Sequence, residues 1–108
     1  MAIHVNEGDV MGPQQVGGKK IIGEENGCVA GFCMGLAYYT EEEYVKPGIH
    51  DDQEGFFVLK GEGYAKVGDE EFPLKPGTFF VALKGVPHTI KVARGKGPIK
   101  VLWTHGAV

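Results

Sequence analysis

The chain has only two cysteines among its 108 residues, and none of its apolar runs approaches the length of a membrane span. Two cysteines are too few to staple a small secreted scaffold, and a membrane-spanning helix needs about 20 consecutive apolar residues. The segment from Met1 to Val10 also lacks the layout of a signal peptide. We therefore expect a cytoplasmic protein with no membrane partner.

The sequence also lacks an excess of basic residues. Its formal net charge is −3, and lysines and glutamates are interspersed rather than clustered. A surface that binds nucleic acid needs a basic patch, so we expect no nucleic-acid partner. Hydrophobic residues make up 43% of the chain, which is enough for a core. We expect one domain over residues 1–108.

Helix signals are scarce and strand signals are dense. Thr40 followed by three glutamates permits one helical turn at most, because Pro47 and Gly48 end the run, and an extended strand or a loop fits this segment equally well. The expected strands cover residues 19–22, 29–40, 44–46, 55–60, 64–67, 70–74, 78–83, 88–93 and 99–104. Glycine and proline turns separate them. Many short strands with such turns indicate an all-β sandwich or barrel.

Two of these strands, at residues 56–59 and 79–83, are apolar on both faces. Such a strand is covered on both sides, whereas a strand with one face in water alternates between apolar and polar residues. The outer cover is either the N-terminal part of the chain or a second copy of it. A homodimer is the more economical cover for so short a chain.

Side-chain parity predicts which residues face inward. Along the strand at 29–40, we expect Phe32, Met34, Leu36 and Tyr38 to line the interior, since they share one face. By the same rule, Phe56 and Val58 share a face with Glu54. We expect Trp103 in the core or at a subunit contact.

Three residues form a candidate metal site. His50 and Glu54 are four positions apart, so an extended strand points both to one face. His88 directly follows Pro87, which is typical of the first position of a strand. Taken singly, each residue also suits a solvent-exposed loop or a strand edge. If they converge inside a barrel, two imidazoles and one carboxylate suit a divalent transition metal with open positions.

The other histidines and the cysteines are given structural roles. His4 and His105 lie near the termini, where we expect surface positions. Cys28 and Cys33 are five residues apart, so they face opposite sides of a straight strand. We expect reduced, buried thiols.

The spacing of these residues resembles the cupin superfamily. The first cupin motif contains His-x-His, then three or four residues and a glutamate, then six residues and a glycine. His50, Glu54 and Gly61 match its second histidine, glutamate and glycine. Pro76-Gly77 and His88 resemble the turn and histidine of the second motif. The resemblance covers residues 44–92 and implies a single-domain double-stranded β-helix, the jelly-roll or cupin barrel, with a metal at His50, Glu54 and His88.

Two positions depart from the cupin pattern. Gly48 stands where the first histidine belongs, and Val92 where the second motif has asparagine. Three interpretations stay open. The three remaining ligands hold the metal with water or substrate, or Gln53, Asp52 or Tyr38 supplies a fourth donor, or the pocket has lost its metal. The resemblance implies Fe, Mn, Ni, Zn or Cu without choosing among them.

The leading functional hypothesis is a metal-binding cupin that acts on a small organic molecule. The resemblance allows dioxygenase, isomerase, epimerase or lyase chemistry. The second hypothesis is a non-catalytic module that binds or senses a small ligand, which the missing histidine at position 48 favours. A third is an assembly subunit without a ligand.

Overall fold

Eight β-strands make up the regular structure of residues 2–10 and 17–106, the part of the chain that the computed structural model describes. The strands are β1 (Gly17–Ile22), β2 (Cys33–Tyr39), β3 (Gln53–Lys60), β4 (Gly63–Val67), β5 (Glu70–Leu74), β6 (Phe79–Ala82), β7 (His88–Val92) and β8 (Ile99–Gly106). Two single-turn 3-10 helices, η1 (Glu7–Asp9) and η2 (Glu24–Asn26), accompany them. In these ranges no helix is long and apolar enough to cross a membrane.

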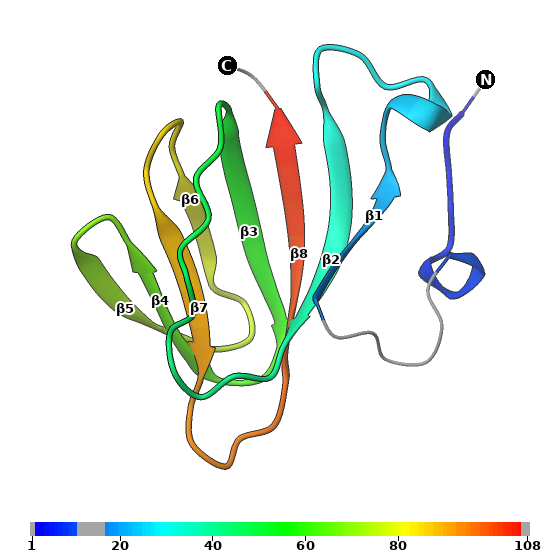
Figure 1. Ribbon diagram of the computed structural model, residues 1–108. Coiled ribbons are helices and arrows are strands. Elements are labelled where there is room, and N and C mark those ends of the chain that lie inside the picture. Colours follow the sequence, from blue (N-terminus) through cyan, green and yellow to red (C-terminus); the bar gives the residue numbers. More distant parts are fainter. Residues whose placement is uncertain (1, 11–16, 107–108) are drawn as a thin grey trace.

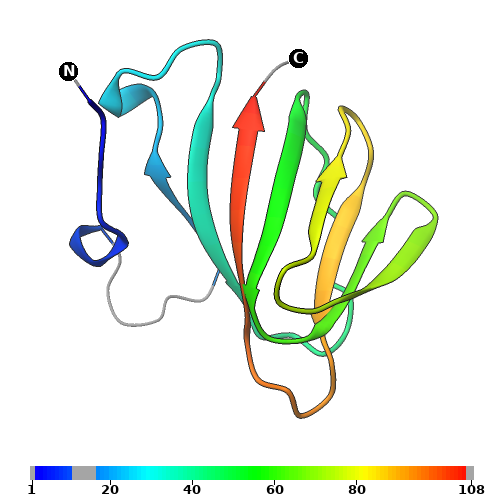
Figure 2. The same ribbon diagram turned by 180° about the vertical axis from the view of Figure 1, so that it is seen from behind.

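The strands form two antiparallel sheets. The larger sheet has the order β1-β2-β8-β3-β6, and the smaller has the order β5-β4-β7. Figures 1 and 2 show the smaller sheet lying against one face of the larger, with β8 in the middle of the larger sheet. The predicted all-β class and jelly-roll architecture are confirmed.

The core lies between the two sheets. Alternate residues of β3 and β8 enter it from the larger sheet, because successive side chains of a strand point to opposite faces. The buried core residues are Ala37, Phe56, Val58, Ala65, Leu74, Ala82, Ile90, Val92, Ile99 and Val101. Trp103 packs against this cluster, as expected for a core residue. The inward parity of Glu54, Phe56 and Val58 is also confirmed.

The predicted parity of β2 is wrong. The register pairs Gly35 with Trp103 and Ala37 with Val101, so the odd-numbered residues of β2 face the core. Met34 and Leu36 lie on the outer face, where they share a hollow with Val5. Because both faces of β2 are apolar, the sequence pattern contains no signal that distinguishes them.

Three expected elements are also shorter or absent. The strand expected at 29–40 begins only at Cys33, because Ala30 and Gly31 both take positive φ and turn the chain. Residues 44–46 form no strand, and no helical turn occurs at Thr40 to Glu43. Conversely, β8 continues two residues beyond its expected end at Thr104.

The outer face of the larger sheet is covered only in part. The segment around Val5 and η1 lies beside Met34, Leu36 and Leu102, and Lys100 forms an ion pair with Glu7 at 3.1 Å. Further along the sheet, Phe79 and Val81 on the edge strand β6 are 78% and 52% exposed. The N-terminal part of the chain therefore covers the β2 side of the sheet and leaves the β6 side open.

Candidate metal centre

The backbone brings the three predicted ligands to one end of the barrel. Glu54 is the second residue of β3 and His88 is the first residue of β7. His50 precedes β3, and its carbonyl accepts a hydrogen bond from Gly85 N–H at 2.9 Å. Gly48 and His88 exchange backbone hydrogen bonds of 2.9 and 3.0 Å. These bonds hold the Gly48–His50 segment beside the start of β7.

The Glu54 carboxylate is the centre of the cluster. Its Oε1 atom lies 3.2 Å from His50 Nε2 and 3.0 Å from His88 Nε2. One ligand atom from each of the three residues lies within 4.8 Å of the others. Donor atoms that share a divalent ion are about 3 Å apart, since each is roughly 2.1 Å from it. The spacing therefore suits a shared metal ion.

Because the Glu54 carboxylate is buried, it needs neighbouring groups to pair with it. Its side chain is only 9% exposed, and an isolated charge in such a place is strongly destabilising unless it is paired or coordinated. No buried side-chain nitrogen or oxygen lacks a hydrogen-bond partner within the described residues. The histidine nitrogens supply the partners of Glu54.

The hydrogen bonds of His88 show which of its ring nitrogens is unprotonated and directs its lone pair toward Glu54. Its Nδ1 lies 3.1 Å from the Val86 carbonyl, which only accepts, so Nδ1 carries a proton. In neutral His88 the Nε2 atom then turns its lone pair toward Glu54 Oε1. Two lone pairs 3.0 Å apart repel unless a cation lies between them. Either a proton or a metal ion meets this requirement.

Without a metal, His88 Nε2 binds a proton more readily than the same atom of an ordinary histidine. The hydrogen bond to Glu54 raises the pKa of His88, and burial opposes this increase without cancelling it. Protons and a metal ion therefore compete for the same nitrogen.

His105 also contacts the Glu54 carboxylate, although the sequence predicts a surface position for it. That expectation is wrong, since its side chain is only 16% exposed and its Nε2 lies 3.2 Å from Glu54 Oε2. Its Nδ1 lies 3.0 Å from Asp52 Oδ1. A signal was present in the sequence: His105 shares the parity of Ile99, Val101 and Trp103, so a strand extended past Thr104 points it inward.

Gly48 lies at the site although it has no side chain to contribute. A Cβ atom built on it would lie 3.6 Å from Nε2 of both His50 and His88. The position that the cupin pattern gives to a histidine therefore does face the cluster. Glycine leaves the space beside these two nitrogens open.

The three residues expected to supply a fourth donor have different roles. Gln53 is exposed and opposite in parity to Glu54, and Tyr38 lies on the outer face beside Lys100. Asp52 contacts the cluster only through its hydrogen bond to His105. Cys28 and Cys33 are free and half-buried, and His4 is exposed, as expected for His4.

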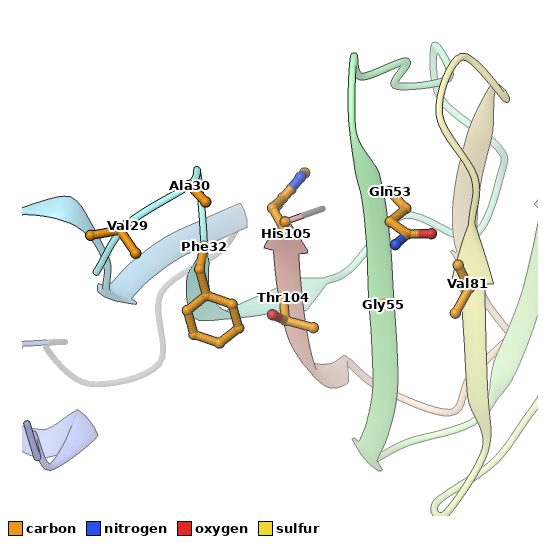
Figure 3. Close-up of a pocket in the computed structure, with 9 residues that line it drawn as sticks. Val29, Ala30, Phe32, Gln53, Gly55, Val81, Thr104 and His105 are labelled. Atoms are coloured by element: carbon orange, nitrogen blue, oxygen red, sulfur yellow. The ribbon is translucent and has the colours of Figure 1, made fainter. Parts of the chain in front are cut away.

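A hollow of about 540 Å³ lies next to the end of β8, on the outer face of the larger sheet. Figure 3 shows its residues, with Phe32 on one side of β8 and Gln53 and Val81 on the other. Its walls are mainly apolar, and it includes His105 but none of His50, Glu54 and His88. The hollow therefore meets the cluster at His105 and does not include the three predicted ligands.

Comparison with solved structures identifies the fold. The polyketide cyclase RemF from Streptomyces resistomycificus is 19% identical with a TM-score of 0.78, and the match covers 98% of this chain and 80% of that one. A cupin protein from Bacteroides fragilis is 16% identical with a TM-score of 0.72, covering 91% and 82%.

An enzyme of higher identity is similar over a shorter stretch. Hydroxypropylphosphonic acid epoxidase from S. wedmorenis, in complex with fosfomycin, is 25% identical with a TM-score of 0.63. The match covers 68% of this chain and 43% of the epoxidase chain, so this chain corresponds to less than half of that enzyme.

Sequence comparison adds the family. A search of curated proteins found no match. The family described as "Cupin domain" matches residues 36–105, which include the cluster from His50 to His105. Since this match spans more than half of the 108 residues, the chain belongs to the cupin domain family.

Proposed function

We propose that the chain binds a divalent transition metal through His50, Glu54 and His88 and acts on a small organic molecule that approaches this metal. The observation that carries the proposal is the arrangement of imidazole nitrogens around one buried carboxylate, 3.0 and 3.2 Å from its Oε1 atom. Two histidines and one carboxylate are the donor set of non-haem iron(II) sites with open positions. Iron(II) is therefore the first candidate among Fe, Mn, Ni, Zn and Cu.

The structure leaves one side of the cluster accessible. The His50 side chain is 41% exposed, whereas those of Glu54 and His88 are 9% and 12% exposed. The absent side chain of Gly48 adds open space beside the same nitrogens. A substrate therefore approaches between Gly48 and His50.

Aromatic core residues close the inner side of the cluster. The Phe56 ring lies 5.7 Å from that of His88 and stacks on Phe80 at 4.5 Å. These rings exclude water from the inner side of the site. The accessible side is therefore the one beside Gly48 and His50.

A metal bound here would supply Lewis-acid or oxygen-activating chemistry. The chain contributes the ligand set, the tautomer of His88 and the hydrophobic side of the site. Val86 fixes that tautomer by accepting the Nδ1 proton, which leaves Nε2 free for the ion. Enzymes occur among the similar structures, and this supports catalysis over ligand storage.

Metal analysis of the purified protein tests the proposal. We expect close to one equivalent of a divalent metal in the wild-type chain and almost none in a His50→Ala, His88→Ala double variant, because the Glu54 carboxylate is then the only one of the three ligands that remains. Elemental analysis by mass spectrometry of protein prepared without chelators measures both.

The matched control is His4→Ala, since His4 is exposed and lies outside the cluster. It removes an imidazole without touching the site, so its metal content should equal that of the wild type. Equal and negligible metal in all three proteins, after reconstitution with iron(II), would contradict the proposal. Thermal stabilisation by a small ligand in such metal-free protein would favour the alternative, a non-catalytic binding module.

A further inference from the structure

We infer that His105 is a fourth protein ligand of the metal and that Asp52 holds its ring in place. This inference rests on the proposed metal at His50, Glu54 and His88 and extends its ligand set. In this arrangement β8 compensates for the histidine that Gly48 replaces.

The first support is the position of His105 Nε2. It lies 3.2 Å from Glu54 Oε2, whereas the distances of 3.2 and 3.0 Å from His50 and His88 are to Oε1. The rings of His105 and His50 are 4.7 Å apart and perpendicular. Three imidazoles thus surround the carboxylate, and β8 contributes one that lies near His50.

The second support is the hydrogen bond between Asp52 and His105. The Asp52 carboxylate accepts the Nδ1 proton at 3.0 Å, so neutral His105 turns the lone pair of Nε2 toward Glu54. Metal-bound histidines nearly always donate their other N–H to a carboxylate or a carbonyl group. His88 shows the same arrangement with the Val86 carbonyl. Both rings are therefore oriented as metal ligands.

The third support is the burial and packing of His105. Its side chain is 16% exposed, and its ring packs edge-on against Trp103 at 5.3 Å. The backbone of β8 pairs His105 directly with Glu54 of β3 and with Cys33 of β2. Because β8 is central in its sheet, the ring has few alternative positions. This rigidity reduces the entropy lost when a ligand is fixed.

Cu(II) is a suitable probe, because it binds nitrogen donors tightly and its EPR spectrum reports the nitrogens bound to it. We expect His105→Ala and His105→Asn to weaken Cu(II) binding by more than about 100-fold and to remove one nitrogen from the spectrum. Asp52→Ala should weaken binding by about 10- to 100-fold and keep the nitrogen count, as a positioning residue would. Competition with a chelator of known affinity measures the binding.

Two controls match these variants. Asp51→Ala removes an exposed carboxylate next to Asp52, and His4→Ala removes an exposed imidazole, so both should bind Cu(II) as the wild type does. Circular dichroism of the metal-free proteins identifies the variants that are folded and therefore comparable.

The outcomes separate this inference from the proposed function. If the wild type and both His105 variants bind Cu(II) with the same affinity and spectrum, His105 is no ligand, and the site of His50, Glu54 and His88 stands. If the wild type itself binds no Cu(II), the proposed function fails, and the inference fails with it.

Discussion

The Glu54 carboxylate lies at the centre of a cluster of three histidines. It is buried, and its two oxygens face His50, His88 and His105. A carboxylate in this position needs positive charge nearby, either as protons on the imidazoles or as a metal ion. The negative charge of this residue is therefore what makes the cluster attractive to a cation.

Tyr39 is a residue whose pKa is changed by burial. Burial in the barrel, assisted by the negative charge of Glu54, raises the pKa of Tyr39 to about 12. In the unfolded chain the tyrosine hydroxyl ionises near pH 10, so the folded state keeps the Tyr39 proton to a higher pH. The resulting contribution to stability is present below pH 10 and is lost as the pH rises toward 12.

We expect the wild type to lose about 1 kcal/mol of stability through Tyr39 between pH 9 and pH 11. Tyr39→Phe should remove this part of the loss, since phenylalanine does not ionise. Urea unfolding at both pH values measures the difference. The control is Tyr64→Phe, because Tyr64 is 41% exposed. An alkaline loss of equal size in wild type and Tyr39→Phe would contradict the assignment.

At the scale of elements, β2 depends on a close approach to its neighbours β1 and β8. Gly35 lies between the carbonyl of Lys19 on β1 and the indole ring of Trp103 on β8, and both would contact any Cβ atom at this position. Its neighbours on the inner face are the small Ala37 and the half-buried Cys33. Small inner residues on β2 thus make room for Trp103.

We predict that Gly35→Ala destabilises the fold by about 1 to 3 kcal/mol, because an inserted methyl group must displace backbone or the indole ring. Chemical denaturation measures the change. Gly18→Ala on β1 is the matched control, since its Cβ would have no neighbour closer than 3.7 Å. Similar effects of the two substitutions would show that Trp103 and the backbone of β1 yield more easily than the structure indicates.

At the scale of the whole molecule, the exposed part of the larger sheet is the main unexplained surface. Phe79 and Val81 on β6 join Phe57 on β3 and Leu102 on β8 in one apolar hollow on the outer face. No charged side chain lines this hollow. An uncharged apolar face is compatible with a second copy of itself in a two-fold contact.

We propose that the chain forms a homodimer through this face. A Phe79→Lys, Val81→Lys variant should be monomeric, because burying two ammonium groups against their copies is unfavourable. Size-exclusion chromatography with light scattering measures the mass. Tyr64→Lys is the control on the other sheet and should stay dimeric. A monomeric wild type at micromolar concentration would contradict the proposal.

Most of the architecture is predictable from local signals. The glycine and proline turns and the short apolar runs predict the strands β3, β4, β5 and β7 closely, because such signals depend on the conformations of neighbouring residues. The spacing of His50 and Glu54 and the position of His88 after Pro87 predict residues that the fold does bring together.

Tertiary structure alone decided which face of β2 points inward and that β8 lies beside β3, where His105 meets Glu54. Both faces of β2 are apolar, so only the packing of Trp103 against Gly35 distinguishes them. His105 contacts Glu54 across 51 positions of sequence because β8 and β3 are neighbours. The order of strands in a sheet depends on pairing between distant parts of the chain, and no local pattern of residues encodes it. This order determined which groups surround the Glu54 carboxylate.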